Sequence, residues 1–412
     1  MIERGTKTAI TAASLIALLA GGAQAATITG WDQANVDVAP TPADGETGAS
    51  VVYDGDPAAA GSTSSGQIVF TPPEAVSPGI SVVAETYDDT GAGSTLTFDG
   101  CLMTSNPTAT CTSGFQSGKR IKQQITGLDP VDLVFTLDNT DPSESFYQVF
   151  GRLINVTGAA LNGFTVELGT GIGSGFEAFG AADAPVSFSF DFTAQPNSSG
   201  LSSTTQFPFG LFGDADDSPN FLLDGFFAAD RTGFTLDQTA TTLTSSGYYG
   251  DYFSIFGDWN SQDDVPQGLF WDFDDDAETD NLLMAWQIGE DLWELRRDVG
   301  ETCDGAACTF GVMLDSFVTG TYDEIVAFLD RGGAADPWVD IFGADAIEDL
   351  ANLNLNYALR VGDVGELEAF TIRTSAMTMP SVAPVPLPAA APMLLAALGG
   401  MAALRRRRRA AG

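Results

Sequence analysis

Hydrophobic and polar residues alternate along much of the chain, in short runs separated by Gly, Pro, Asn, Asp and Ser. A period of two with many Val, Ile, Thr and Phe residues predicts β-strands that bury one face. The predicted strands cover residues 50–53, 66–72, 80–87, 94–100, 131–140, 146–158, 162–171, 185–193, 231–237, 354–364 and 369–375. The pattern predicts a mainly β fold. It favours an antiparallel β-sandwich, jelly-roll or Ig-like, built as one elaborated sandwich or two packed ones.

Helical spacing is confined to two short segments. Residues 321–333 have apolar side chains at helical spacing, acidic residues early in the segment and two glycines at its end. These are helix start and stop signals. A second short helix is expected within residues 344–354. No repeat of fixed period is visible, which disfavours a solenoid or a propeller.

The body of the chain is long enough for one elaborated sandwich or two packed halves. We place a boundary near residues 240 to 250. It separates a β-rich N-terminal half, residues 26–240, from a β-rich C-terminal half, residues 241–375, with an acidic loop and a short helix. Residues 376–384 form a Pro-containing spacer.

The N-terminus has the three-part pattern of a secretory signal peptide. Two basic residues precede an apolar stretch, and the small residues Ala23 and Ala25 stand at the cleavage positions. The apolar stretch is short for a membrane span. We therefore assign residues 1–25 to a signal peptide that is cleaved after Ala25 and directs the chain to the Sec translocon.

The C-terminus, residues 385–412, joins a short motif, an apolar segment and a basic cluster. Residues 389–404 carry no charge, and as a helix of about 24 Å they are slightly short of a bilayer core of about 30 Å. A basic cluster favours the cytoplasmic face. The motif is Val385, Pro386, Leu387, Pro388 and Ala389, and the cluster is Arg405, Arg406, Arg407, Arg408 and Arg409.

This tail resembles the VPLPA-CTERM sorting tail of Gram-negative bacteria. The resemblance implies recognition by an exosortase-type enzyme, a transient anchor in the inner membrane, and transfer toward the cell surface or the extracellular space. A plain single-span anchor is the alternative.

Charge and the lack of histidine exclude several functions. Residues 26–384 contain 10 basic and 54 acidic residues, a net charge of −44, which repels nucleic acids and anionic lipids. The whole chain has no histidine. Catalytic triads that need imidazole, and acid–base catalysis by imidazole, are thereby excluded. We expect no enzymatic activity. The Gly-rich residues 169–180 fit no phosphate-binding motif and are expected to form a turn.

The four cysteines form two local pairs, Cys101 with Cys111 and Cys303 with Cys308. In an exported chain this spacing predicts two disulfides that close small loops. A zinc site built from all four thiolates is the alternative, although the gap in the first pair is wide for zinc ligands.

An acidic segment follows the predicted boundary. Its alternating carboxylates are of the kind that a calcium site needs. An EF-hand loop that starts at Asp272 or at Asp274 would lack the required Gly and the bidentate Glu, so the segment is not an EF-hand. A Ca²⁺ site and a solvated acidic loop remain open. The candidate ligands are Asp272, Asp274, Asp276, Glu278 and Asp280.

Trp259, Trp271 and Trp286 accompany these carboxylates, and Trp293 is close by in the sequence. Trp259 and Trp271 are candidate sugar-binding residues, because aromatic rings beside carboxylates are common in sugar sites. The alternative is that both rings fill the core of a sandwich. A calcium-assisted carbohydrate-binding module or a carboxylate-dependent glycosidase is therefore the second functional hypothesis.

Several stretches of the body together carry a family resemblance. They read YQVFGRLINVTGAALNGFTVELGTGIG, FPFGLFGDADDSPNFLLDGFF, VPQGLFWDFDDDAETDNLLMAW and IEDLANLNLNYALRV, within roughly residues 130–375. They resemble the choice-of-anchor F family of bacterial surface proteins. The resemblance implies a β-rich, exported and tail-anchored protein, and it brings no catalytic residues. The first hypothesis is therefore a surface or extracellular-matrix protein with a structural or adhesive role, retained with exopolysaccharide.

Overall fold

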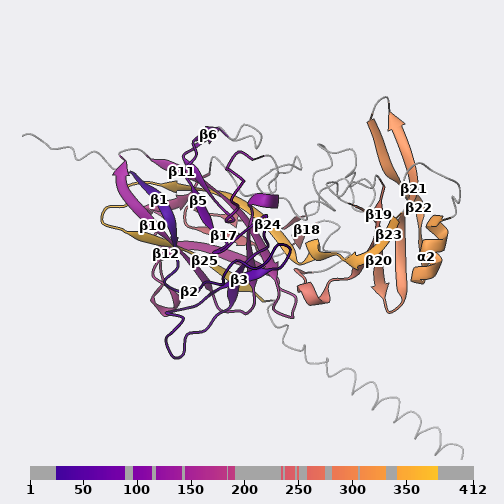
Figure 1. The fold of residues 1–412 in the computed structure, drawn as a ribbon, viewed down its shortest axis with the longest axis horizontal. Coiled ribbons are helices and arrows are strands. Elements are labelled where there is room, and N and C mark those ends of the chain that lie inside the picture. Colours follow the sequence, from indigo (N-terminus) through magenta and orange to yellow (C-terminus); the bar gives the residue numbers. More distant parts are fainter. Residues whose placement is uncertain are drawn as a thin grey trace, which may run out of the picture. The chain divides into compact units, whose positions relative to one another are not determined.

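The computed structural model describes residues 25–88, 96–113, 117–141, 144–182, 184–190, 233–234, 237–245, 248–249, 258–273, 281–304, 307–330 and 341–378. Within these ranges the protein is mainly β, as the sequence predicts (Figure 1). Three sheets contain most of the strands. Two further pairs are β6 (Tyr87–Asp88) with β7 (Thr97–Phe98), and β15 (Gly233–Phe234) with β18 (Tyr248–Tyr249).

The first sheet is antiparallel and joins strands from both ends of the body. Its central strands are β10, β25 and β12, and β13 pairs with β12 outside the main path. In order across the sheet the strands are β1 (Ala25–Asp32), β10 (Val131–Asp141), β25 (Ala369–Met377), β12 (Gly163–Thr170), β17 (Thr242–Ser245) and β16 (Asp237–Gln238), with β13 (Glu177–Ala178) beside β12.

The second sheet is mixed. Strand β11 pairs antiparallel with β24 but parallel with β8 and β9, which differs from the purely antiparallel sheet expected. Its main path is β14 (Val186–Phe188), β24 (Asn352–Val361), β11 (Ser145–Asn155), β9 (Ile121–Ile125), β4 (Gly66–Phe70), β3 (Gly48–Val52) and β2 (Val36–Asp37); β8 (Gly100–Met103) and β5 (Ser81–Val83) branch from β11.

The first two sheets share one apolar core and form a β-sandwich. Phe135 and Phe370 from the first sheet stack with ring centroids 5.7 Å apart, and both are fully buried. Leu153 and Leu355 from the second sheet belong to the same buried cluster. Burial of this kind contributes roughly 25 cal/mol per Å² of apolar surface.

The boundary expected near residue 240 does not separate these sheets. Strands β24 and β25 come from the C-terminal half, yet β24 pairs with β11 and β25 lies between β10 and β12. The described residues up to Met377 form one compact unit. Both halves of the sequence therefore build the same sandwich.

The third sheet lies within the segment between β18 and β24. Its order is β22 (Ala307–Gly320), β21 (Leu292–Asp304), β20 (Leu282–Gly289), β19 (Gln267–Asp272) and β23 (Ile341–Ala346). Helix α2 (Tyr322–Leu329) packs beside β21 and β22 (Figure 1). Thr321 caps this helix by accepting a bond from Glu324 N, and the Glu324 side chain returns a bond to Thr321 N. The predicted helix in this region is thus confirmed, over fewer residues.

Trp259 joins the two chain segments that enter and leave the third sheet. Its indole Nε1 donates to Ala351 O at 2.6 Å, and its carbonyl oxygen accepts from Asn155 Nδ2 at 3.0 Å. Ile347 N donates to Pro266 O at 3.0 Å, directly before β19 and β23 begin to pair. The third sheet is therefore an insertion whose two stems lie side by side.

The second predicted helix, residues 344–354, is wrong. That segment contains the end of β23, the 3-10 helix η6 (Glu348–Leu350) and the start of β24. Eight consecutive residues of β24 are buried. The sequence pattern of such a fully buried strand has no period of two, so periodicity alone cannot distinguish it from a buried helix. The other described 3-10 helices are η1 (Ser117–Lys119), η2 (Gly173–Gly175) and η4 (Gln262–Asp264).

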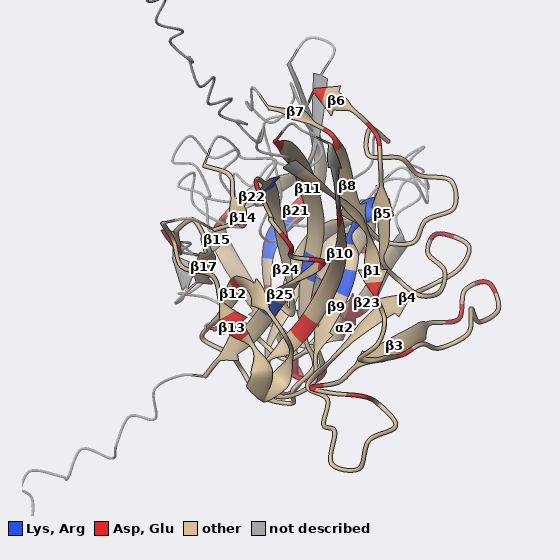
Figure 2. Cartoon of the chain, turned by 90° about the vertical axis from the view of Figure 1, so that its left-hand side faces the viewer, with Lys and Arg blue, Asp and Glu red and all other residues tan. Residues whose placement is uncertain are grey.

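The few cations of the body are placed mostly inside it. Of the eight described Lys and Arg residues between 26 and 384, four are buried: Lys119, Arg120, Arg296 and Arg297. Figure 2 shows acidic residues along the loops near β3 and at β13, whereas most of the described basic residues lie within strands. The described surface is therefore even more acidic than the composition suggests.

Candidate functional site

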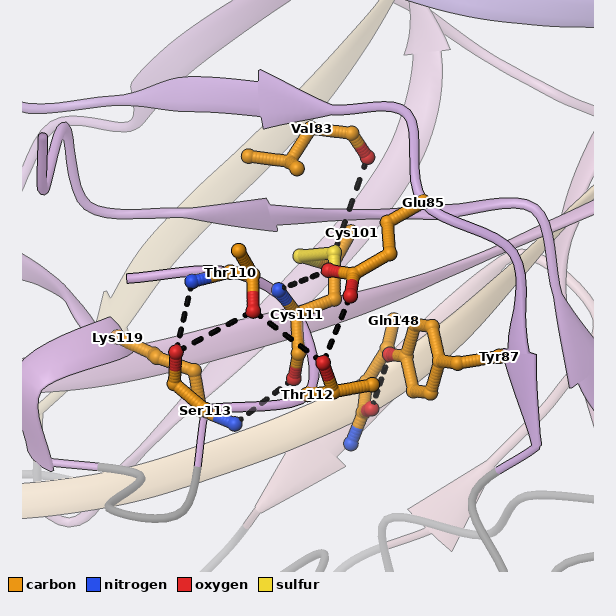
Figure 3. Close-up of a disulfide and its surroundings, with 10 residues drawn as sticks. All are labelled: Val83, Glu85, Tyr87, Cys101, Thr110, Cys111, Thr112, Ser113, Lys119 and Gln148. Atoms are coloured by element: carbon orange, nitrogen blue, oxygen red, sulfur yellow. Dashed lines mark hydrogen bonds between the residues drawn. A yellow bond between two sulfur atoms is a disulfide. The ribbon is translucent and has the colours of Figure 1, made fainter. Parts of the chain in front are cut away.

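Cys101 and Cys111 form the disulfide that their spacing predicts (Figure 3). Cys101 lies in β8, and Cys111 lies in the loop that follows. Glu85 fixes this loop, because its carboxylate accepts from Cys111 N at 2.6 Å and from Thr112 Oγ1 at 2.7 Å. Both sulfurs are buried, so this disulfide has a structural role.

A buried lysine lies beside the same loop. Lys119 Nζ donates to Cys111 O at 2.9 Å and lies 4.4 Å from the centroid of the Phe150 ring (Figure 3 shows the lysine). A carbonyl oxygen and an aromatic face both stabilise a buried ammonium group. The lysine therefore fastens the disulfide loop to β11.

Cys303 and Cys308 are directly opposite each other in the β21–β22 pair. Their side chains lie outside the described part of the structure, so the second disulfide remains a prediction. A zinc site built from all four thiolates does not fit, since Cys101 and Cys111 are already joined.

The acidic segment is described only at its first residue. Asp272 is the last residue of β19, whereas the ligand candidates Asp274, Asp276, Glu278 and Asp280 lie outside the described residues. Within the described ranges no group of three or more His, Cys, Asp or Glu residues is placed to hold a metal ion. Calcium binding by the acidic segment remains a prediction.

Trp259 and Trp271 do not fit the sugar-binding hypothesis. Trp259 is 0% exposed in the sandwich core and Trp271 is 4% exposed in the core of the third sheet. A sugar needs an accessible ring face, and neither indole offers one. Both residues fill cores, which was the alternative interpretation of their sequence pattern.

A groove of about 770 Å³ lies at the edge of the second sheet, beside β14 and β24. It is lined by small residues, by Phe146, Phe188 and Phe190, and by the ion pair between Arg360 and Glu144. Phe190 is 58% exposed. Ser187, Ser189 and Asp363 add further polar groups to its walls. A concave site that combines aromatic and polar groups is a candidate ligand site.

The ion pair determines the chemistry of the groove. Arg360 Nη2 donates to Glu144 Oε1, and this bond lowers the pKa of Glu144 and raises the pKa of Arg360. Glu144 therefore stays ionised and Arg360 stays protonated near neutral pH. The pair can orient a polar ligand but is poorly suited to transfer a proton.

Sequence analysis did not identify these groove residues. Glu144 and Arg360 are 216 positions apart, and only the pairing of β11 with β24 brings them together. No local signal marked Phe190, because it lies inside the predicted strand 185–193 and its exposure is evident only in the structure.

The sorting signals lie outside the described residues. This applies to Ala23 at the N-terminus and to the motif Val385–Ala389 and the cluster Arg405–Arg409 at the C-terminus. Ala25 is the first residue of β1, but its side chain is not described. Among the helices that the structure describes, none is both long and apolar enough to cross a membrane.

Comparison with known proteins gives no relative. No protein-family model matches the chain, and neither the curated proteins nor the solved structures contain a match. Function is therefore argued from the chain itself.

Proposed function

We propose that this chain is an exported, tail-sorted surface or extracellular-matrix protein with a structural or adhesive role and no catalytic activity. Membership of the choice-of-anchor F family is part of the proposal. An exosortase-type enzyme would act at the C-terminal tail, and retention with exopolysaccharide would follow export.

The observation that carries the proposal is the Cys101–Cys111 disulfide in the body between the two terminal signals. Structural disulfides form and persist in oxidising compartments outside the cytoplasm. The disulfide thus agrees with the signal peptide pattern of residues 1–25, which is independent of it. The acidic surface also suits a protein that must stay soluble outside the cell.

The tail motif is tested by replacing its two prolines in a Gram-negative host that has an exosortase. We expect the wild-type chain at the cell surface or in the medium, and Pro386→Ala/Pro388→Ala in the membrane fraction. Pro392→Ala, which changes a proline of the tail outside the motif, is the matched control and should behave like wild type. Equal distribution of all three chains would show that the motif is not a sorting signal.

A further inference from the structure

One face of the third sheet combines aromatic, apolar and charged side chains. Trp286 on β20 is directly opposite Glu294 on β21, and Glu294 is directly opposite Thr319 on β22. Residues that are paired in this way point to the same side of a sheet. Trp286 is half-buried, in contrast to the other described tryptophans, Trp31, Trp259, Trp271 and Trp293, which are buried.

Glu294 connects the aromatic and basic side chains. Its Oε1 accepts from Trp286 Nε1 at 3.1 Å and from Arg296 Nε at 2.8 Å. The second carboxylate oxygen, Oε2, takes part in neither bond. The side chains of Arg296 and Glu294 are 10% and 19% exposed, so the ion pair is mostly buried and the Glu294 carboxylate is its more accessible partner.

The register between β21 and β22 shifts next to the second aromatic ring, Phe317. Leu295 pairs with Val318 and Arg297 with Met313, so residues 314–317 of β22 have no partner in this register. Phe317 directly precedes Val318, and strand alternation from Thr319 puts it on the face of Glu294. Its ring centroid is 4.5 Å from the Arg296 guanidinium carbon, and the side chain is 49% exposed. Bulges often redirect a side chain at the edge of a sheet next to a functional site.

Exposed aliphatic side chains belong to the same two strands, β20 and β21. Leu292 is 43% exposed, and strand alternation puts it on the face of Glu294. Ile288, at the end of β20, is 38% exposed. We call Trp286, Leu292, Glu294, Arg296 and Phe317 together the Trp286 surface.

Charge limits what the Trp286 surface can bind. Glu294 and Arg296 neutralise each other, while the body around them carries a net charge of −44, which repels anions. A neutral ligand with both apolar faces and hydroxyl groups matches this combination. One of its C–H faces would pack on the exposed Phe317 ring, beside Trp286, which is half-buried against the sandwich core, and its hydroxyls would bind the Glu294 carboxylate.

We propose that the Trp286 surface binds a neutral saccharide. This inference is independent of the sorting tail, because it depends only on the third sheet. It assigns sugar binding to Trp286 and Phe317 in place of the predicted residues Trp259 and Trp271, which are buried.

Affinity electrophoresis of the exported chain tests the proposal. The probes are three neutral polysaccharides cast in the gel, dextran, mannan and galactomannan, with dextran sulfate as an anionic counterpart of dextran. We expect retardation by at least one neutral gel and none by dextran sulfate. Retardation by none of the neutral gels, or by dextran sulfate alone, would overturn the proposal. Concentration-dependent self-association without retardation would instead make this face a contact between two copies of the chain.

Two matched variants locate the binding. Phe317→Ala should weaken binding about fivefold, since an aromatic contact contributes about 1 kcal/mol and 1.4 kcal/mol corresponds to a factor of ten. Leu128→Ala removes an apolar side chain of similar exposure from the bend between β9 and β10, outside both candidate sites, and should leave binding unchanged. Both residues are exposed enough for the fold to tolerate the change. Loss of binding in a third variant, Phe190→Ala, but not in Phe317→Ala would place the saccharide in the groove and overturn the proposal.

Discussion

Asp132 and Arg373 form a buried, bidentate ion pair in the first sheet. Arg373 Nε and Nη2 donate to the two carboxylate oxygens, each at 2.7 Å, and the guanidinium lies 3.9 Å from the Phe176 ring centroid. Asp132 also accepts from Gly173 N at 2.7 Å. The pair therefore holds the Gly-rich turn after β12, which sequence analysis expected to be a turn and not a phosphate site.

Removal of one partner should be costly. In Arg373→Ala the Asp132 carboxylate, 1% exposed, loses its cation, and we expect the free energy of unfolding to fall by about 3 kcal/mol. Urea unfolding measures this loss. The double variant Asp132→Leu/Arg373→Met leaves no unpaired charge and should lose less than the single variant. A single variant within about 0.5 kcal/mol of wild type would contradict the assigned role.

Glu144 provides a pH-dependent prediction at the groove. Its pKa is lowered from 4.5 by the bond from Arg360, so the pair stabilises the fold above pH 4.5 and loses this effect as the pH falls through the lowered pKa. The side chain is 53% exposed, so the contribution is at most about 1 kcal/mol. In Arg360→Met the NMR titration of Glu144 should shift upward. Arg152→Met, the control, removes a bond to Asn354 and should leave that titration unchanged.

At the scale of elements, the two cysteine pairs differ in context. Cys101–Cys111 joins a strand to a loop, whereas Cys303 and Cys308 face each other across a hairpin. We expect Cys101→Ser/Cys111→Ser to lower the free energy of unfolding by about 2–3 kcal/mol, as a short closed loop predicts. Peptide mapping without reduction should also recover a Cys303–Cys308 linkage. Free thiols at 303 and 308 in the exported chain would refute the second disulfide.

Local patterns predicted some elements well and missed others. Helix α2 was predicted because its capping box and its end signals are local in the sequence. Strand β21 was missed because it contains six charged residues in thirteen and does not have the pattern of an apolar strand. The structure explains this composition, since Glu294 and Arg296 lie on one face while Trp293 and Leu295 fill the core on the other.

Long-range pairing could not be predicted from these patterns. Whether β24 and β25 complete the sandwich or form a separate domain depends on partners about 200 residues away. The groove and the Trp286 surface could not be predicted for the same reason, because the register of the paired strands decides which side chains come together in each. The sequence therefore predicted the fold class and the first disulfide, but not the domain boundary or the candidate binding surfaces.

At the scale of the whole molecule, charge repulsion should govern stability. Half of the described cations of the body are buried, so acidic residues face solvent with few exposed cations between them. Raising NaCl from about 0.01 M to 1 M shortens the screening length from about 30 Å to about 3 Å. We expect Tm to rise over this range, with sucrose of equal osmolality as the control. A Tm that is flat or falls would contradict a surface dominated by repulsion.

The central claim is export followed by processing at both ends. Intact mass spectrometry of the protein recovered from outside an exosortase-bearing host tests it most directly. The account predicts a mature chain that begins at Ala26, ends near Val385–Ala389 and has Cys101 joined to Cys111. A chain found only in the cytoplasm, with residues 1–25 and Arg405–Arg409 still attached and its cysteines reduced, would contradict it.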